Sequence, residues 1–196
     1  MTSSLADPAL DQLFREARSR NGWMEEPLAE TAIRQIYDLA KFGATSANIS
    51  PARFVWVTSS EAKEKLAALA TPGNGVKIRQ APATVIIGYD LDFPELIPKL
   101  FPHNPGAKDW FQDPVARETA AFRNGTLQGA YLMLAARALG LDCGPMSGFS
   151  NAAVDEAFFA GTNVKSNFIC CIGRGTDENL FGRSPRLTFE EANRIV

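Results

Sequence analysis

Two short segments near the ends of the chain carry arginine side chains that could bind an anion. Arg18 and Arg20 flank the hydroxyl group of Ser19, and a second pair, Arg183 and Arg186, lies near the C-terminus. Guanidinium groups remain charged and can bind phosphate oxygens through two parallel hydrogen bonds. Either segment alone could also be a solvated turn. Together they indicate a binding site for one phosphate group.

Two further segments could supply polar contacts to a flat ligand. The first is a run of small hydroxyl and amide side chains. The second is a short apolar segment bounded by glycine, whose backbone N–H groups a ligand can approach closely. Ordinary loops and tight turns share both compositions. The residues concerned are Thr45, Ser46 and Asn48 in the first segment, and Pro145, Met146, Ser147 and Gly148 in the second.

Several kinds of catalytic machinery are missing from the sequence. No GxGxxG, GxxxxGKS/T, GxSxG or HExxH motif is present. One histidine and three cysteines without a CxxC pair provide too few ligands for a zinc site, so neither a metal site nor a His-centred triad is expected. Cys170 and Cys171 lie in an apolar run and are expected to be buried hydrophobic residues. This inventory favours a protein that binds a phosphorylated cofactor, which then carries the chemistry.

Length and composition limit the class of protein. The 196 residues predict a single domain over residues 1–196, and the 45% of hydrophobic residues can form a core. Twenty basic and 22 acidic side chains leave no basic surplus to drive nucleic-acid binding. No apolar stretch approaches the roughly 20 residues of a membrane span, and the N-terminus lacks a signal-peptide pattern. We therefore expect a cytoplasmic protein that binds neither nucleic acid nor membranes.

Helix caps and hydrophobic periodicity define the elements that must position these residues. Strands are predicted over 53–58, 82–89 and 167–173, and the proline-rich stretch 91–113 is expected to be a long connection that covers a site. Helices mixed with strands without strict alternation indicate an α+β layered fold. The helices are predicted over 8–18, 29–42, 60–70, 114–139 and 150–159, the last two with caps at Asp113 and Ser150, and a final helix opens at the capping box of Thr188.

The longest predicted helix is rich in small residues at its centre, including Gly125 and Gly129. An interior glycine costs about 1 kcal/mol relative to alanine, so we expect the close approach of another backbone to compensate.

Eight short strings, in sequence order, resemble the FMN-dependent nitroreductase family over essentially the whole chain. Within that family they are most similar to the malonic semialdehyde reductases of uracil degradation. The strings are NGW (21–23), TSAN (45–48), SPAR (50–53), LFPH (100–103), TAAFRN (119–124), GPMSGF (144–149), VKSN (164–167) and PRL (185–187).

This resemblance implies a fold, a cofactor and a reaction. The implied fold is a central, mostly antiparallel sheet flanked by helices, in an intertwined homodimer with FMN at the subunit interface. A partner helix would then approach Gly125 and Gly129. NADPH or NADH would donate hydride to flavin N5, and the flavin would reduce malonic semialdehyde to 3-hydroxypropanoate, with no catalytic side chain. Two alternatives remain open: a general nitroreductase or quinone reductase of the same fold, and a flavin-binding protein without turnover.

The resemblance also implies which residues hold the cofactor. The phosphate contacts fall on Arg18, Ser19 and Arg20, with Arg183 and Arg186 near the C-terminus. Arg53 and Arg123 are the arginines considered for a substrate carboxylate, although each could equally form a surface salt bridge. The remaining flavin contacts implied are Thr45, Ser46 and Asn48, then Asn74, and the loop facing flavin N5 at Pro145, Met146, Ser147 and Gly148. Many relatives carry glutamate where this chain has Ser147.

Overall fold

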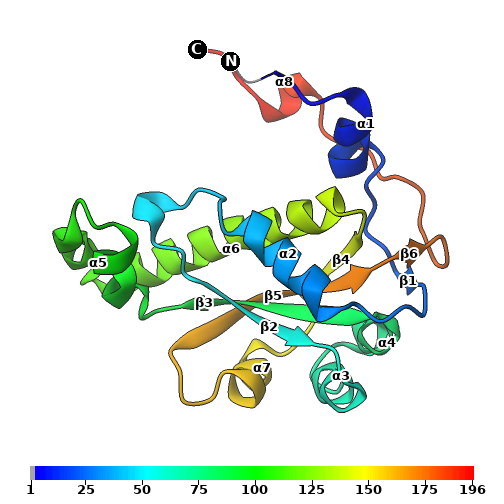
Figure 1. Ribbon diagram of the computed structural model, residues 1–196, viewed down its shortest axis with the longest axis horizontal. Helices are drawn as coiled ribbons and strands as arrows, with labels where there is room; N and C mark the ends of the chain where they lie inside the picture. Colours follow the sequence, from blue (N-terminus) through cyan, green and yellow to red (C-terminus); the bar gives the residue numbers. More distant parts are fainter. Residues whose placement is uncertain (1–2) are drawn as a thin grey trace.

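The computed structural model describes residues 3–196 and is built around a four-stranded antiparallel sheet (Figure 1). The strand order is β2-β3-β5-β4, so β3 and β5 form the centre and β2 and β4 the edges. Both central strands are mostly buried and apolar, as expected for strands that are covered on both faces. The strands span Ala52–Val57 (β2), Ala83–Asp90 (β3), Asp142–Met146 (β4) and Val164–Gly173 (β5).

Helices cover both faces of this sheet and produce three layers (Figure 1). On one face, α2 and α6 pack Ile36 and Leu132 against Val85 and Ile172. On the other face, α3, α4 and α7 cover Ile86. The α+β layered fold and the antiparallel central sheet are therefore confirmed. The helices span Glu30–Ala40 (α2), Ser60–Ala67 (α3), Pro72–Gln80 (α4), Pro114–Ala138 (α6) and Asn151–Phe158 (α7).

Three of the predicted helix caps are confirmed. The side chains of Asp113, Ser150 and Thr188 each accept a hydrogen bond from a backbone N–H three residues further on, which satisfies an otherwise unpaired donor at the helix start. Thr188 also forms the predicted capping box, with Glu191, at the start of α8 (Phe189–Ala192).

The first helix is shorter than the prediction of 8–18. It consists of α1 (Asp7–Leu10) and a π-helical turn, η1 (Asp11–Arg15). The chain extends after this turn because Ser19 forms a parallel β-bridge with Cys143.

Two elements differ from the sequence-based expectation. α4 was not predicted, because Gly73 and Gly75 weaken its helical pattern, and its burial of Ile78 beside α3 provides the missing stabilisation. The segment at 144–146 was predicted to be a loop but belongs to β4. Pro145 is tolerated there because β4 is an edge strand, where a missing N–H costs no ladder hydrogen bond on the open side.

The close approach of another backbone expected at the small residues of α6 is confirmed at Gly125, where that backbone is β3 of the same chain. The partner helix that the resemblance placed at Gly125 and Gly129 is therefore wrong. A Cβ atom added to Gly129 would lie 2.5 Å from Cζ of Phe168, and one added to Gly125 would lie 3.0 Å from Cβ of Tyr89. Both neighbours belong to the chain's own sheet. The small residues therefore allow α6 to pack closely on β3 and β5.

The predicted long connection over 91–113 contains short helical turns rather than irregular chain. Phe93, Ile97 and Ala107 are fully buried in a third core cluster, and Phe93 packs edge-to-face on Phe111 with ring centroids 4.8 Å apart. The turns are η3 (Phe93–Leu96), α5 (Ile97–Leu100) and η4 (Pro105–Phe111).

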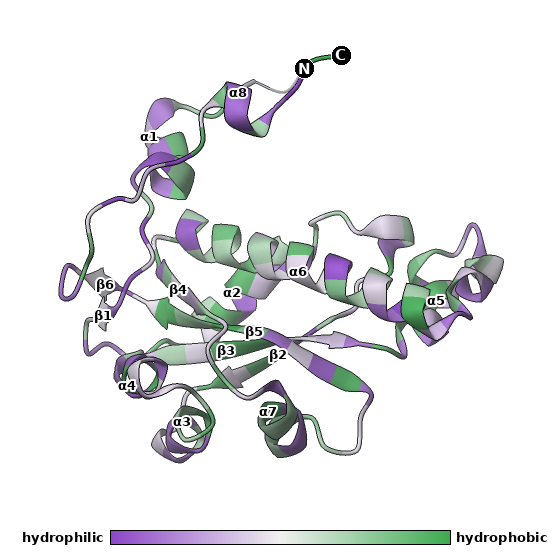
Figure 2. Ribbon diagram, turned by 180° about the vertical axis from the view of Figure 1, so that it is seen from behind, coloured by the Kyte–Doolittle hydropathy of each residue, from purple (hydrophilic) through white to green (hydrophobic). Residues whose placement is uncertain are grey.

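The two ends of the chain leave the sheet together. A short ribbon pairs β1 (Gly22–Trp23) with β6 (Gly175–Thr176), and beyond it α1 and α8 lie close together, away from the sheet (Figure 1). We call residues 177–196 the C-terminal arm; from residue 181 onward every residue is exposed. Seen from behind, the hydrophobic colours concentrate on the central strands (Figure 2). Within residues 3–196, no helix is long and apolar enough to cross a membrane.

Candidate functional site

Two arginine side chains cross-link the segment after η1 to the C-terminal arm. Arg18 donates a hydrogen bond to the carbonyl oxygen of Phe181, and Arg183 donates back to the carbonyl oxygen of Ala17 at 3.2 Å. Arg186, three residues further on, donates only to carbonyl groups of its own turn. No carboxylate in residues 3–196 forms an ion pair with these three arginines. We call Arg18, Ser19, Arg183 and Arg186 the cationic edge.

Arg20 is bound differently from the arginines of the cationic edge. Its guanidinium group forms ion pairs with Asp142 at 3.3 Å and Asp177 at 2.5 Å, and donates to the carbonyl oxygen of Thr176. Burial lowers the pKa of Arg20, but the two carboxylates outweigh this effect, so the pKa lies above its ordinary value. We call Arg20, Asp142 and Asp177 the arginine hub.

The cationic edge continues into the loop after β4. Ser19 lies beside Cys143, and the chain runs from there through Pro145 and Met146 into Ser147 and Gly148. The N–H groups of Ser147 and Gly148 donate to no acceptor within residues 3–196. These groups are therefore available to a ligand beside the edge strand.

Asn74 is held against this loop. Its side-chain amide on α4 donates to the carbonyl oxygen of Gly148 at 3.1 Å, and the N–H of Thr71 donates to the same oxygen at 2.9 Å. The side-chain carbonyl oxygen of Asn74 accepts no hydrogen bond from residues 3–196. The structure therefore brings together Asn74 and the 145–148 segment, which the resemblance assigns to the same flavin site.

Lys77 was not predicted as a site residue. It lies one helical turn after Asn74 on α4, is half-buried, and forms no ion pair with a residue in 3–196. A half-buried ammonium group without a carboxylate is suited to an anionic or electron-rich ligand. The spacing Asn-x-x-Lys could have indicated it, since residues three apart share a helix face.

The loop that carries Thr45, Ser46 and Asn48 lies elsewhere. Thr45 Oγ1 accepts from the N–H of Ser50, and Asn48 donates to the carbonyl oxygen of Leu100 at 2.8 Å. Ala47, Asn48 and Ser50 have positive φ angles of 46°, 49° and 39°, which are unfavourable for residues other than glycine and asparagine. These contacts hold the loop, including the turn η2 (Ser46–Asn48), in one conformation.

Contacts along α6 show how far this loop is from the cationic edge. The N–H of Ser46 donates to Asn124 at 2.9 Å, whereas Cys143 in β4 donates to the carbonyl oxygen of Met133. Nine residues of helix separate these two contacts, which corresponds to about 14 Å. Figure 1 shows η2 and β6 toward opposite ends of the molecule. One chain therefore does not bring all of the predicted flavin contacts together.

The two arginines considered for a substrate carboxylate differ in their availability. Arg53 forms an ion pair with Asp90 at 2.6 Å and donates to the carbonyl oxygens of Ser50 and Ala52. Arg123 on α6 is exposed and has no hydrogen-bond or ion-pair partner within residues 3–196. It lines a cavity of about 590 Å³ together with Tyr89, Glu118, Phe122 and others.

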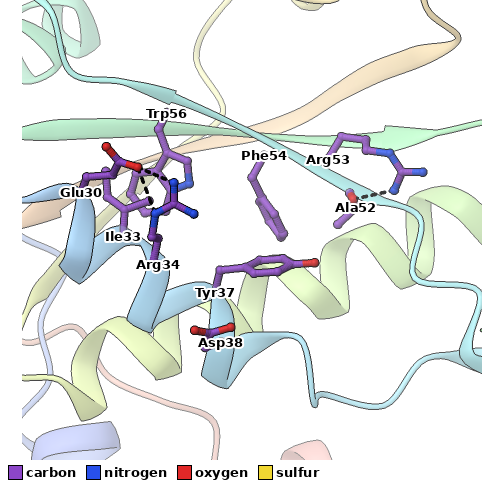
Figure 3. A pocket seen from close by; sticks show the side chains of 9 residues that line it. All are labelled: Glu30, Ile33, Arg34, Tyr37, Asp38, Ala52, Arg53, Phe54 and Trp56. Carbon is purple, nitrogen blue, oxygen red and sulfur yellow. Dashed lines mark hydrogen bonds and ion pairs between the residues drawn. The ribbon is translucent and has the colours of Figure 1, made fainter.

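A larger groove, of about 730 Å³, lies between α2 and the edge strand β2 (Figure 3). Its apolar side chains are Ile33, Phe54 and Trp56, together with Tyr37, which packs edge-to-face on Phe54. Apart from Arg53, no residue predicted to contact flavin or substrate lines this groove. The groove is therefore an open surface separate from the cationic edge.

The three cysteines are buried free thiols, which confirms the expectation for Cys170 and Cys171. Contact with the Cys143 thiol and burial raise the pKa of Cys170, and burial raises the pKa of Cys171 to about 11. Neutral, buried thiols are poor nucleophiles. The site is therefore not a thiol-based catalytic centre.

Comparison with known proteins identifies a family match over most of the chain. The model of the nitroreductase family matches residues 15–174. A protein of Caulobacter vibrioides named as a candidate NADH dehydrogenase/NAD(P)H nitroreductase is 67% identical over 194 residues, covering 99% of this chain and all of the relative. A similarly named protein of Ralstonia pickettii is 57% identical and covers 98% of both chains.

Solved structures share the same fold. A candidate nitroreductase of Exiguobacterium sibiricum, solved in complex with FMN, superposes with a TM-score of 0.87 at 21% identity and covers the whole of both chains. A candidate nitroreductase of Bacillus subtilis superposes with a TM-score of 0.85 at 19% identity, covering 97% of this chain.

Proposed function

This chain belongs to the nitroreductase family, and we propose that it is an FMN-dependent oxidoreductase that uses NADH or NADPH to reduce malonic semialdehyde to 3-hydroxypropanoate. The names of the relatives support the NAD(P)H-dependent reductase activity. The aldehyde substrate is supported by the similarity of the eight sequence strings to malonic semialdehyde reductases.

One observation carries the cofactor proposal: Ser19, next to Arg18, pairs with Cys143 in β4, and the chain leads from there into the N–H groups of Ser147 and Gly148, which are free within residues 3–196. The guanidinium groups of Arg18, Arg183 and Arg186, which have no carboxylate partner in the described part of the chain, suit the phosphate of FMN. The N–H groups of Ser147 and Gly148, with Asn74, suit the polar edge of a flavin ring. The residues present therefore fit FMN at this edge of the sheet.

Bound FMN supplies hydride transfer between a nicotinamide and a second substrate. The chain's own residues have binding and positioning tasks. Arg18 and Arg183 hold the phosphate, and the loop at Ser147 and Gly148 directs N–H groups toward the ring. Lys77 lies on the same helix face as Asn74. Its positive charge stabilises negative charge that develops beside this face during the reaction.

We also propose that the complete site forms in a homodimer. Thr45, Ser46 and Asn48 lie about 14 Å along α6 from the level of β4, so a second copy would supply them to the cationic edge of the first. Two exposed surfaces support this arrangement. The C-terminal arm is exposed, with Phe181 79% and Ile195 85% accessible, and the groove along β2 leaves an edge strand uncovered.

Arg123 is the better of the two arginines for the substrate carboxylate. Malonic semialdehyde carries one carboxylate, which a free guanidinium group can bind in a bidentate way. Arg53 is already bound to Asp90, whereas Arg123 has no partner in residues 3–196. In an Arg123→Lys variant we expect a higher KM for malonic semialdehyde and an unchanged KM for a neutral nitroaromatic substrate.

Anaerobic stopped-flow absorbance tests the proposed reaction. The purified protein is reduced with NADH or with NADPH and then mixed with malonic semialdehyde, and the flavin absorbance is followed. Rapid return of the oxidised spectrum is the expected result. Reoxidation by nitroaromatics or quinones alone would instead assign a general reductase, and no reoxidation by any of these compounds would assign a flavin-binding protein without turnover.

A further inference from the structure

Arg20 is the second arginine of the segment 18–20 that was predicted to bind phosphate, yet its guanidinium group already has three partners. Asp142 lies at the start of β4, and Thr176 and Asp177 lie where the C-terminal arm begins. The Arg20 side chain is only 19% exposed, whereas that of Asp177 is 88% exposed. Asp142 also accepts a hydrogen bond from the N–H of Gly175 at 3.0 Å. The arginine hub therefore ties β4 directly to the start of the arm.

The glycines around the hub leave space for this arrangement. A Cβ atom added to Gly175 would lie 2.3 Å from Cγ of Arg20, and one added to Gly144 would lie 2.6 Å from the Arg20 carbonyl oxygen. The stem of Arg20 therefore lies directly on the backbone of Gly175. The N–H of Arg20 also donates to the carbonyl oxygen of Cys143 at 3.0 Å, which fixes its backbone on the outer edge of β4.

We propose that Arg20 does not bind the cofactor phosphate but acts, with Asp142, as a positioning residue that sets the path of the C-terminal arm. This inference rests on the proposed function, because the path of the arm determines where Arg183 and Arg186, two of the proposed phosphate ligands, lie. Arg20 Nε and Nη1 are bound to Asp142, Thr176 and Asp177, so a phosphate on the same guanidinium group would lie beside two carboxylates whose negative charge repels it. Arg18 has no carboxylate partner within residues 3–196, so it is the arginine of this segment that contacts the phosphate.

Asp142→Asn is the variant that separates positioning from direct binding. It keeps the size of the side chain but removes one of the two negative charges that hold Arg20, while Asp177 remains. If Arg20 were a phosphate ligand, this change would remove a negative charge beside the phosphate, and phosphate binding would be unchanged or stronger. If Arg20 is a positioning residue, Asp142→Asn weakens phosphate binding as Arg20→Ala does.

The measurement is the ratio of the dissociation constants for riboflavin and FMN, obtained by fluorescence titration of the full-length protein. This ratio isolates the phosphate contribution from ring binding. We expect Arg20→Ala and Asp142→Asn each to lower it by about tenfold, the effect of losing one charge-assisted contact. Arg174→Ala is the matched control, because Arg174 pairs with Glu26 at the exposed surface and should leave the ratio unchanged. A ratio that falls in Arg20→Ala but not in Asp142→Asn overturns the positioning role, as does a ratio unchanged in both.

Limited trypsin digestion of the flavin-free protein provides a readout that does not depend on the cofactor. Cleavage after Arg183 and Arg186 reports how firmly the arm is held. Arg20→Ala, Asp142→Asn and Gly175→Ala should each accelerate this cleavage several-fold over wild type and over Arg174→Ala, and equal rates would contradict the proposal. If circular dichroism shows that Arg20→Ala does not fold, the cleavage rate of Asp142→Asn decides whether the hub holds the arm. A wild-type protein that binds no FMN would refute the proposed function, while the digestion would still test the hub.

Discussion

At the level of single residues, the loop after β4 contains a contact too close to admit one more methyl group. A Cβ atom added to Gly148 would lie 2.7 Å from Nδ2 of Asn74 and 3.1 Å from Oγ1 of Thr71. The position of the Asn74 amide therefore depends on glycine at 148. The resemblance indicated both residues, but this dependence appears only in the structure.

Gly148→Ala is expected to weaken FMN binding by about tenfold, because the methyl group displaces the Asn74 amide and the adjacent N–H groups. Gly73→Ala is the matched control, since no atom lies within 4 Å of its added Cβ. It should leave FMN affinity unchanged and stabilise α4 by up to about 1 kcal/mol. Fluorescence titration of both variants checks this expectation, and equal affinities would contradict it.

The buried Cys171 thiol gives the fold a pH dependence with a definite sign. Its pKa is raised by burial from 9.0 to about 11, so between these pH values the unfolded chain loses a proton that the folded protein keeps. The free energy of unfolding should therefore fall as pH rises from about 9 to 11, by about 2 to 3 kcal/mol. Urea unfolding of wild type and Cys171→Ala across this range measures the difference. A Cys171→Ala protein with the same pH slope as wild type would disprove this assignment.

At the level of elements, the sequence predicts those helix and strand boundaries that depend on neighbouring residues in the chain. The caps at Asp113, Ser150 and Thr188 could be identified because side-chain oxygens act on their own helix. β4 could not be identified, because its strand state depends on pairing with β5 rather than on its glycine and proline. The segments predicted to contact flavin were identified by resemblance. The partners of Arg20, and the lack of an ion pair for Lys77 within residues 3–196, required the tertiary structure.

The packing of α6 on the sheet depends on a second glycine contact. Gly129→Ala would bring a methyl group within 2.5 Å of the Phe168 ring, and overpacking of this kind typically costs about 1 to 3 kcal/mol. We expect a lower free energy of unfolding despite the better helix propensity of alanine. Urea denaturation measures it, with Gly73→Ala as the control that should shift the midpoint in the opposite direction. An unchanged or higher stability for Gly129→Ala would show that α6 is not held this closely.

At the level of the whole molecule, the predicted flavin contacts fall into two groups on one chain. The cationic edge, Asn74 and the 145–148 loop lie together, while the loop at Thr45 to Asn48 lies further along α6. In a dimer with twofold symmetry, each contact between a residue of one copy and a different residue of the other copy occurs twice. A homodimer would therefore form two equivalent sites, each using both groups.

Mixing two defective variants tests this shared site. Ser46 is exposed, so Ser46→Tyr should not disturb the fold but should block the flavin site across the interface. Arg18→Ala together with Arg183→Ala should disable the cationic edge. After the two variants are unfolded and refolded together, about a quarter of the sites should be intact and bind FMN, because half of the dimers are mixed and each has one undamaged site. Recovery of no sites would contradict a site shared between copies.

The most direct test of the phosphate-anchored flavin site is an equilibrium titration of wild type and Arg18→Ala with FMN and with riboflavin. Wild type should bind FMN much more tightly than riboflavin. Arg18→Ala should lose about tenfold in FMN affinity with little change for riboflavin, because the phosphate is the one part of the cofactor that Arg18 is proposed to contact. Equal affinities of wild type for FMN and riboflavin, or no binding of either, would contradict the assignment of the cationic edge as the cofactor phosphate site.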